Sequence, residues 1–515
     1  MSSSSSSSSQ SLARLLAAEV DGRTAAPRYR LSQLRHLHTA LLSNAQELRE
    51  AIIADSGHTP AEAEAEFLLT MACVREFFGG IDVKKDVEEE YRVARGESAP
   101  ERRVGKGLVW IVTGPGPGLF GVVGAVGAAV AAGNCVVVEL PSTTQSLPAL
   151  LRRILPSALD NDTFLITTTS SAPSPLPSCI LVHQPATPPT SQQAIQYVTP
   201  SPLPPVLAIV DRTANLSIAA KALVTARFGF NGKSSYAPDV VLVDEGVRGG
   251  FVDAVVREAG RLLAEKRGGG GKASRTRRDE EEGKTLEEAR RSGRVVVEGG
   301  NGIVIEIDER DSAILHRKIN SPLLLIHTIT SLDDAITFAT TTTTTTTSPN
   351  PTASPPHLAT MIFAQNASAK YLAQFIPSRL SLVNHIPFHL LVGPPYPLNT
   401  PLPLNTLTRY TPPMFTIALP ILLPPPSSSP NPTTPTSDLI TDLLTTSSSS
   451  PISPSHLLAK AQTLAATPLP EDDQRDGKRV GFFEQGLFIG TGVTALTVGG
   501  VAGVGVWGVR RFLRG

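Results

Sequence analysis

Two side chains that could carry out chemistry lie close together in the sequence Gly-Lys-Ser-Ser at residues 232–235. A serine hydroxyl can attack an ester when a neighbouring base removes its proton, and serine and lysine act together in this way in some hydrolases. Ser235 follows Lys233 by two residues, so ester hydrolysis is one hypothesis for this loop. The same residues are also ordinary in a surface loop, and a motif match alone remains a hypothesis.

A second segment has the spacing of a dinucleotide-binding turn. Gly116, Gly118 and Gly121 form a GxGxxG pattern between an apolar strand and a helix of small residues, and Glu139 closes the next strand. In such turns the glycines let the backbone approach a pyrophosphate, and the acid accepts a hydrogen bond from a ribose hydroxyl. These four residues are therefore candidates for binding NAD or NADP. Two prolines inside the turn weaken the case, because each removes a backbone donor.

The elements around these residues predict an α/β fold with a parallel sheet. Apolar strands are expected at 108–113 and 135–140 with a helix at 121–132 between them, which is a βαβ unit. Leucine spacing predicts one long amphipathic helix over 30–56 and a second helix that ends near residue 79. Strands and helices alternate farther along the chain, with strands expected at 164–167, 180–183, 206–210, 240–243, 295–298, 302–307, 323–328, 358–363 and 380–383.

The stretch from Asp211 to Val243 resembles the active-site segment of the aldehyde dehydrogenase superfamily. In that family an Asp-headed helix is followed by N-x-G-Q-x-C, by A-P-D and by a strand. Placing A-P-D on residues 237–239 puts Ser235 on the cysteine that attacks the aldehyde. The run Ala-Ala-Gly-Asn at 131–134 similarly resembles the family's A-A-G-N. The resemblance implies a parallel-sheet cofactor-type domain, an α/β catalytic-type domain and a dimerising arm, and hence a homodimer.

Several residues on which the family's chemistry depends differ at the matching positions. The oxyanion-donating Asn falls on Gly116, the Lys that holds the adenosine ribose on Leu140, and the general-base Glu on Ser201. The stretch 163–210 contains no Asp or Glu at all, so it offers no carboxylate for proton abstraction. The Glu that grips the nicotinamide ribose falls on Lys318, where a donor has replaced an acceptor. The resemblance thus implies the family's shell without its nucleophile, base or cofactor contacts.

Composition excludes other classes of protein. The 46 basic and 46 acidic residues cancel, so no overall field favours nucleic acid as a partner. The 3 cysteines are too few for a disulfide framework, and the 10 histidines have no metal-ligand spacing. The acidic run of Glu62, Glu64 and Glu66 is expected to be a solvated helix face, as charge runs usually are.

The C-terminal sequence predicts a membrane span. Gly486–Val509 contains no charged residue, basic residues flank both ends, and about 20 apolar residues suffice to cross a bilayer. Few residues follow, so the span would insert after synthesis and leave the rest of the chain facing the cytosol. Such a tail is similar to the membrane-anchored fatty aldehyde dehydrogenase branch, which implies the endoplasmic reticulum or the peroxisome.

Low-complexity segments set the expected domain boundaries. A Ser-rich disordered tail covers 1–12, a cofactor-binding-like domain 13–200 and a catalytic-like domain 201–400. The second domain is expected to contain a solvated insertion at 267–294 and a Thr-rich loop at 340–356, and a Pro/Ser/Thr-rich linker is expected at 401–480 before the tail anchor.

Three functional hypotheses remain at this point. The first is a membrane-anchored, catalytically inactive relative of the aldehyde dehydrogenases that acts as a binding or scaffolding protein. The second is an active NAD(P)-dependent oxidoreductase acting on the aldehyde group of long-chain substrates. The third is ester hydrolysis by Ser235 with Lys233.

Overall fold

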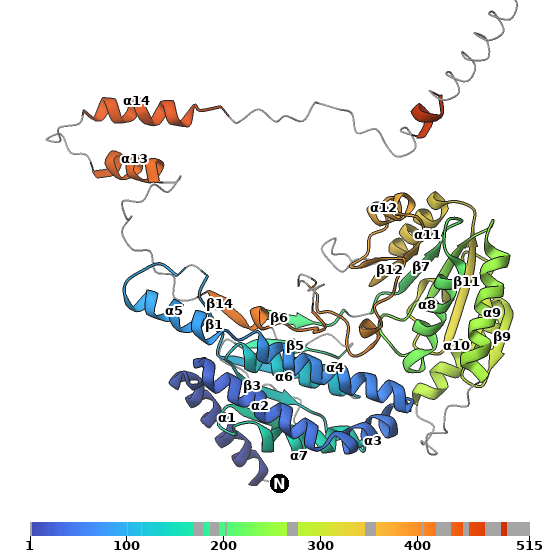
Figure 1. The fold of residues 1–515 in the computed structure, drawn as a ribbon, viewed down its shortest axis with the longest axis horizontal. Helices are drawn as coiled ribbons and strands as arrows, with labels where there is room; N and C mark the ends of the chain where they lie inside the picture. Colours follow the sequence, from blue (N-terminus) through green and yellow to red (C-terminus); the bar gives the residue numbers. More distant parts are fainter. Residues whose placement is uncertain are drawn as a thin grey trace, which may run out of the picture. The chain divides into compact units, whose positions relative to one another are not determined.

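The computed structural model describes residues 3–99, 101–114, 116–168, 179–185, 195–200, 203–264, 277–345, 357–398, 400, 402, 406–418, 434–445, 453–468 and 486–491. Contacts divide the chain into two units, Met1–Leu423 and Pro424–Gly515. The larger unit holds two sheets in which most strands run parallel. In Figure 1 the strands of the first sheet are coloured from cyan to green, and those of the second from green to orange.

The first sheet is five-stranded and wholly parallel, with the strand order β4-β3-β2-β5-β6. This is the order of a doubly wound sheet, in which the direction of winding reverses between β2 and β5. Its strands are β2 (Leu108–Val112), β3 (Cys135–Glu139), β4 (Phe164–Thr167), β5 (Ile180–His183) and β6 (Ile195–Val198).

Alternation of side chains along β2 gives the first sheet two apolar faces. Val109 and Ile111 pack on the side of α6, α7 and the outer helices α2, α3 and α4, whereas Leu108 and Trp110 pack against Leu15 of α1. The helices are α1 (Ser3–Asp21), α2 (Pro27–Ser43), α3 (Ala45–Ser56), α4 (Pro60–Gly79), α5 (Val83–Ala94), α6 (Leu119–Ala131) and α7 (Ser146–Ala158).

Small residues bring α6 close to α4. Every residue of α6 is buried, and a Cβ added at Gly127 would lie 2.8 Å from the ring of Phe77. The glycines and alanines of α6 are therefore a packing device, and the helix that follows the Gly116–Gly121 turn has a structural reason for its composition.

The second sheet has seven strands in the order β13-β12-β7-β8-β11-β10-β9, and only β9 runs antiparallel to its neighbour. Helices α8 and α9 pack on one face, and α11 and α12 on the other (Figure 1). The strands are β7 (Val206–Val210), β8 (Val240–Asp244), β9 (Arg294–Gly299), β10 (Gly302–Glu306), β11 (Leu323–Ile329), β12 (Ala359–Phe363) and β13 (Ser381–Val383). The helices are α8 (Leu216–Phe228), α9 (Arg248–Ala264), α10 (Arg277–Ser292), α11 (Leu332–Thr345) and α12 (Asn366–Phe375).

A short two-stranded sheet joins distant parts of the larger unit. β1 (Arg103–Gly105) pairs antiparallel with β14 (Thr416–Ala418). Short 3-10 turns complete the unit: η1 (Arg23–Ala25), η2 (Gly229–Gly232), η3 (Ala313–His316), η4 (Phe388–Leu391) and η5 (Pro412–Phe415).

The second unit contains α13 (Thr434–Thr445) and α14 (Pro454–Ala465), which contact each other.

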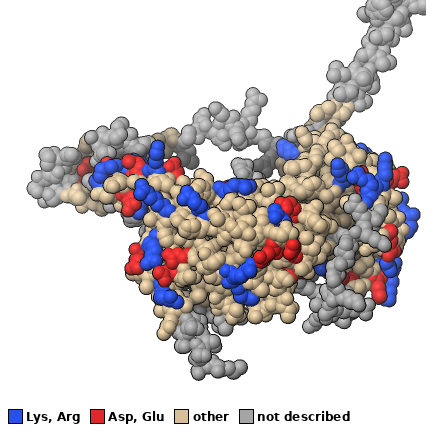
Figure 2. Space-filling view, turned by 60° about the horizontal axis from the view of Figure 1, so that its bottom comes forward, with Lys and Arg blue, Asp and Glu red and all other residues tan. Residues whose placement is uncertain are grey.

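Figure 2 shows acidic and basic side chains interspersed on the face that it displays, with uncharged surface between them. Charged side chains of the larger unit form ion pairs, as Arg95 does with Glu88 at 3.2 Å and with Glu97 at 3.0 Å. On this face neither sign of charge dominates.

Some predicted elements are wrong in their bounds. The long helix over 30–56 is broken at Asn44, whose side chain donates to the carbonyl of Ala40 and ends α2. Helix α1 begins at Ser3, inside the tail predicted to be disordered. The predicted insertion includes α10, and α11 continues through Thr340–Thr345, which we expected to be loop.

The predicted linker at 401–480 also begins too early. Tyr410 and Phe415 are 1% and 0% exposed and belong to the core of the first sheet. β14 lies in the same segment. The segment packs because its aromatic residues contact a sheet that is distant in sequence. Its high proline content predicted a linker and gave no sign of these contacts.

Candidate active site

The loop that carries Ser235 connects α8 and η2 to β8. Asn215 caps α8 by accepting a hydrogen bond from the backbone of Ile218 at 3.1 Å, and Asp211 accepts from the hydroxyl of Thr213 at 2.5 Å. These local bonds fix the start of the helix after β7. The chain re-enters the second sheet directly after Asp239, where β8 begins. The loop therefore belongs to the connection between the neighbouring parallel strands β7 and β8.

Ser235 is half-buried and is not paired with Lys233. The Lys233 ammonium group lies 3.0 Å from Glu282 of α10. No residue in the described part of the chain forms a hydrogen bond with the Ser235 hydroxyl. The two side chains that sequence spacing suggested as nucleophile and base therefore have separate environments, and the geometry does not favour a Ser–Lys pair.

The start of the loop is held in an unusual backbone conformation. Phe230, Asn231 and Gly232 all have positive φ angles, of 51°, 56° and 66°. This conformation costs a bulky residue such as Phe230 about 1–2 kcal/mol, whereas Asn and Gly adopt it more readily. Contacts with the end of α3 and the start of α4 offset the cost: the Phe230 amide donates to Glu62 at 2.7 Å, and the Asn231 side chain donates to the carbonyl of Ser56 at 2.9 Å.

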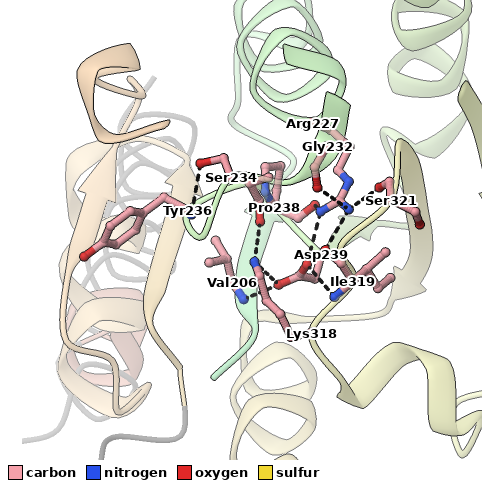
Figure 3. Close-up of polar contacts among 11 residues, drawn as sticks. Val206, Arg227, Gly232, Ser234, Tyr236, Pro238, Asp239, Lys318, Ile319 and Ser321 are labelled. Carbon is pink, nitrogen blue, oxygen red and sulfur yellow. Dashed lines mark hydrogen bonds and ion pairs between the residues drawn. The ribbon is translucent and has the colours of Figure 1, made fainter. Parts of the chain in front are cut away.

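Asp239 organises the end of the loop (Figure 3). Its carboxylate accepts hydrogen bonds from Arg227 at 3.1 Å, from Lys318 at 2.9 Å and from the amides of Val206 and Ile319 at 2.7 Å and 3.0 Å. Arg227 is fully buried and also donates to the carbonyls of Gly232, Pro238, Ile319 and Ser321. One acid thus faces two buried cations and ties together four segments of the second sheet.

Lys318 points into the protein. Besides Asp239, its ammonium group bonds to the carbonyl of Ala237 at 3.2 Å, and its side chain is 7% exposed. Burial lowers the pKa of Lys318, and Asp239 opposes this shift. Lys318 occupies the position where the resemblance places a ribose-binding Glu, so this residue neither accepts a hydrogen bond nor faces a ligand.

The turn with the GxGxxG pattern is closed by a carboxylate from α4. Glu66 is 5% exposed and accepts a hydrogen bond from the amide of Phe120 at 3.2 Å. A Cβ at Gly118 would lie 2.9 Å from the same carboxylate oxygen. Burial raises the pKa of Glu66, while the amides of Phe120 and Leu119 lower it. The helix N-terminus that would hold a pyrophosphate already carries an anion, which argues against that interpretation of the turn.

The other candidate cofactor residues also have partners within the protein. Glu139 accepts a hydrogen bond from the indole of Trp110 at 3.4 Å. A Cβ at Gly121 would lie 3.1 Å from Pro394, and a Cβ at Gly116 would have only the Gln145 side chain near it, at 3.7 Å. Close packing accounts for Gly121, and the role of these residues in binding NAD or NADP stays a prediction.

Gln184 and Tyr410 lie at the point where the winding of the first sheet reverses. Doubly wound sheets bind ligands outside the carboxyl ends of the strands at this point. Here Gln184, directly after β5, donates to the carbonyl of Gly121 at 2.9 Å and contacts the Tyr410 hydroxyl at 3.3 Å. Leu140, where the resemblance places a ribose-holding Lys, is fully buried. The residues present do not fit a nicotinamide dinucleotide in the family's manner.

The three cysteines offer no substitute nucleophile. Cys73, Cys135 and Cys179 are all buried in the cores around the first sheet. Burial raises the pKa of Cys73 and Cys135 to about 12 and that of Cys179 to about 11. The thiolate is the reactive form of cysteine, so these thiols are poor nucleophiles at neutral pH.

An apolar groove of about 830 Å³ lies beside the candidate loop. Its described lining comes from α4, from the ends of α8 and η2, and from η4, and includes Leu68, Leu69, Phe228, Phe230, Phe388 and Leu391. Ser235 and Lys233 are absent from the described lining. The groove has the volume of a small-molecule pocket, typically about 300–1,000 Å³, and is formed mostly by carbon.

Sequence reasoning missed the role of Glu66 and the buried cation pair. Glu62, Glu64 and Glu66 were predicted to form one solvated face, but only Glu64, which pairs with Arg49, is exposed as expected. The missed signal is helical spacing: residues 62 and 66 are four apart and share a face, whereas residue 64 lies away from them.

Comparisons with known proteins bear on the sequence and the fold. Residues 13–172 match the aldehyde dehydrogenase family. Aldehyde dehydrogenase family 3 member B1 of Mus musculus is 24% identical over 358 residues, which cover 64% of this chain and 74% of that protein. The substrate-bound structure of Staphylococcus aureus AldH is 17% identical, has a TM-score of 0.63, and covers 85% of this chain and 99% of that chain. Residues 13–172 thus match an aldehyde dehydrogenase domain, and the larger unit has a fold similar to that of the solved aldehyde dehydrogenases.

The strand order and the likeness to the solved structure confirm the predicted α/β fold with parallel sheets. Another relative, 4,4′-diaponeurosporen-aldehyde dehydrogenase of Staphylococcus aureus, is 27% identical over 142 residues, or 25% of this chain and 30% of that protein.

Within the described residues, no helix is both apolar and long enough to cross a membrane. Residues 486–491 of the predicted span are helical, and 492–509 lie outside the described part of the chain.

Proposed function

We propose that this protein is a membrane-anchored member of the aldehyde dehydrogenase superfamily that binds an apolar ligand and does not oxidise aldehydes. The activity named for its relatives requires a nucleophile, a proton acceptor and a bound nicotinamide cofactor. The proposal is that this chain has kept the fold and a ligand-binding groove without these catalytic groups, and acts as a binding or scaffolding protein.

The environment of Ser235 carries the proposal. A serine needs a base close by, whereas a cysteine is partly ionised and intrinsically nucleophilic. The carboxylates described around the loop have other partners: Asp239 bonds to two cations, Glu282 to Lys233, and Glu62 to the amide of Phe230. These contacts support a loop without a general base.

The groove supports the binding half of the proposal. Leu68, Phe388 and Leu407 are 59%, 48% and 37% exposed, and all three line the same groove. Contiguous exposed apolar surface commonly marks a binding site. A long alkyl or acyl chain would bury this surface and gain about 25 cal/mol per Å² of apolar area removed from water.

The charge-free C-terminal segment supports the membrane anchor. Fusing the last residues, from 470 to 515, to a fluorescent reporter should direct it to the endoplasmic reticulum or the peroxisome. The variant Leu496→Arg should release it, because an arginine at the centre of a span costs about 2.5–3.5 kcal/mol. A cytosolic reporter with the unchanged tail would overturn the anchor.

The competing proposal is an active NAD(P)-dependent oxidoreductase. It is favoured by structural neighbours solved with NADP or NAD⁺, the Methanocaldococcus jannaschii GapN and an indole-3-acetaldehyde dehydrogenase, with TM-scores of 0.57 and 0.59 at 16% identity each. Identity this low supports the fold alone. The inward orientation of Lys318 speaks against the same cofactor contacts here.

One set of measurements separates the proposals. The full-length protein is titrated with NAD and NADP by equilibrium dialysis and is then assayed with dodecanal for reduced cofactor. We expect no turnover and no tight cofactor binding; turnover above that of Ser235→Ala would establish the oxidoreductase. Ester hydrolysis is tested in parallel with p-nitrophenyl laurate, and a loss of hydrolysis in both Ser235→Ala and Lys233→Ala would support the third hypothesis.

A further inference from the structure

We propose that a pocket between α1, α7 and the edge strand β4 binds a phosphate group. None of its described lining residues lines the apolar groove, so the site is separate from the one in the proposed function. Two sources share the chemistry of this ligand. They are the head group of an anionic lipid and a soluble phosphate.

The pocket follows the outer edge of the first sheet and has a volume of about 440 Å³. β4 is the end strand of that sheet, α7 packs on one of its faces and α1 on the other. The described lining divides into an apolar and a polar set. The apolar set is Pro156, Phe164, Leu165 and Ile166, and the polar set is Ser11, Arg14, Arg152, Asn161 and Thr168.

Arg152 of α7 holds a positive charge in this pocket. Its Nη2 donates to the carbonyl of Leu140 at 3.2 Å and to that of Pro141, which fixes the guanidinium at the carboxyl end of β3. Its Nε–H is buried and has no acceptor in the described part of the chain. A buried donor without an acceptor destabilises the folded state. Arg152 thus has two peptide carbonyls as partners, and neither carries a full negative charge.

Arg14 of α1 brings a second positive charge to the same pocket. Its side chain is exposed, and its guanidinium donates to the hydroxyl of Ser11 at 3.2 Å, one turn earlier in the helix. Among the described residues, neither arginine pairs with a carboxylate, and the lining contains no Asp or Glu. Like charges that share a pocket repel each other, and an anion bound between them would remove this repulsion.

The acids that flank Asn161 in the sequence have partners elsewhere. Asp162 pairs with Arg23 at 3.1 Å, and Asp160 accepts a hydrogen bond from the hydroxyl of Tyr29 at 2.9 Å. Asn161 itself lines the pocket, whereas Asp160 and Asp162 are not among its described lining residues. This turn therefore offers the pocket an amide, and its two carboxylates serve contacts with η1 and α2.

A phosphate matches this lining better than a carboxylate does. A phosphate monoester carries a charge of about −1.5 to −2 at neutral pH and has three acceptor oxygens. A carboxylate has one charge and two oxygens. Two guanidinium groups supply two positive charges, and their planar sets of donors fit phosphate oxygens. The apolar side chains beside them favour a phosphate that is attached to an apolar group.

Isothermal titration calorimetry of the full-length protein in a non-ionic detergent tests the site with three probes. Dioctanoyl phosphatidic acid presents the phosphate as a lipid head group, inorganic phosphate presents it as a free ion, and acetate is the carboxylate comparison. We expect phosphatidic acid to bind on the order of tenfold more tightly than acetate, and to bind more weakly as the salt concentration rises. Binding of phosphatidic acid alone would assign the lipid source, and similar binding of inorganic phosphate would assign a soluble phosphate.

The variants Arg14→Gln and Arg152→Gln each remove one of the two charges. Each should weaken phosphate binding on the order of tenfold. Arg14 is exposed and bonds only within its own helix, so its variant should fold even if the loss of two carbonyl contacts destabilises Arg152→Gln. The matched control is Arg153→Gln, the next residue of α7, which is exposed, pairs with Glu47 and is not among the described lining residues. This control should leave the affinity unchanged.

Three results would overturn the site. They are the absence of binding by both phosphate probes, binding of acetate as tight as that of phosphate, and an equal loss of affinity in Arg153→Gln and Arg14→Gln. The last result would mean that the overall charge of this surface attracts the probe. A circular dichroism melt of each variant confirms that it is folded. None of these results bears on the apolar groove or on aldehyde oxidation, which the dodecanal assay measures separately.

Discussion

At Asp239 a single carboxylate is enclosed with two cations, and the balance of energies there is delicate. Burying ions costs several kcal/mol each, and their attraction offsets this only when the remaining hydrogen bonds are made. Asp239 makes them through the amides of Val206 and Ile319, and Arg227 through a set of carbonyls. The cluster therefore stabilises the loop only as a complete set.

Replacing Asp239 by Asn should destabilise the protein strongly. The variant leaves Arg227 and Lys318 buried without an anion, and breaking a buried ion pair typically costs about 3–5 kcal/mol. Urea unfolding of the full-length protein followed by tryptophan fluorescence measures the loss. The control Asp253→Asn changes an exposed acid on α9 and should shift the free energy of unfolding by less than about 0.5 kcal/mol. A similar small shift for both variants would contradict the cluster's role.

Restoring the thiol should not restore oxidation. In Ser235→Cys the side chain regains nucleophilic character, but the surrounding carboxylates remain committed to Arg227, Lys318, Lys233 and backbone amides. We expect no reduced cofactor above the Ser235→Ala background with dodecanal, because the loop would still lack a base for the later hydrolytic step. Measurable turnover by the cysteine variant would show that a proton acceptor reaches the loop.

The candidate site could be predicted only in part from these residues. Aligning A-P-D located Ser235 and identified Lys318 as a departure from the family pattern. It could not show that Lys318 turns inward to Asp239, because the two are 79 positions apart and their contact depends on the fold of the second sheet. Local spacing likewise suggested Lys233 as a base, while Glu282 from a charged insertion is its actual partner.

The start of α6 illustrates how one element depends on another. Glu66 of α4 satisfies the amide of Phe120, which has no partner within its own helix. The charge also complements the helix dipole, but burial raises the pKa of Glu66, so the ionised form carries a desolvation cost. A neutral acceptor of the same shape should serve nearly as well.

Two substitutions at Glu66 should therefore differ in effect. Glu66→Ala removes the cap and should lower the free energy of unfolding by about 1–2 kcal/mol, as loss of an N-terminal cap does. Glu66→Gln keeps an acceptor oxygen and should stay within about 0.5 kcal/mol of the unchanged protein. Thermal melts of both variants make the comparison. An equally large loss in Glu66→Gln would mean that the charge, and not the hydrogen bond, holds the helix start.

The contact between α11 and the start of β12 should make stability depend on pH. His357 is 2% exposed and bonds to the carbonyl of Ala339, and burial lowers its pKa below 6.5. The unfolded chain then binds more protons than the folded chain just below pH 6.5, so the free energy of unfolding falls as the pH falls, by at most about 1.4 kcal/mol per pH unit.

Urea titrations between about pH 7 and pH 5 test this dependence. His357→Gln keeps a donor for the Ala339 carbonyl and removes the titrating group, so its stability should change less over this range. His389, whose pKa burial also lowers, contributes in the same direction and remains in both proteins. Equal slopes for the variant and the unchanged protein would exclude His357 as the source.

Elements with strong apolar patterns were predictable, and weakly patterned ones were not. The central strands of both sheets are buried on two faces and read as continuous apolar runs. β6 and β14 lie at edges, are short and are mostly half-buried, so their sequences carry little signal. Thr340 and Thr341 of α11 were expected to form loop, but their hydroxyls donate to the carbonyls of Ile336 and Thr337, one turn earlier.

At the scale of the whole molecule, the chain returns from the second sheet to the first. After β13 it forms the groove wall at Phe388–Leu391, places Arg409 behind that wall and then forms β14, which pairs with β1. The groove thus depends on a segment that follows both sheets in the sequence. Its proline-rich composition predicted a linker, because partners more than 280 positions away are invisible to local pattern.

Truncation decides between the boundary predicted from composition and the one that the structure indicates. A protein ending at residue 423 keeps every described element of the larger unit and should show one cooperative melt, whereas a protein ending at residue 400 loses Arg409, Tyr410, Phe415 and β14. Removing a single large buried aromatic side chain costs about 3–5 kcal/mol, and a domain's total stability is about 5–15 kcal/mol. The shorter protein should therefore be insoluble or lack a cooperative transition in circular dichroism. If it melts cooperatively at the same temperature as the longer one, residues 401–418 are a linker after all, and the groove wall does not need Arg409.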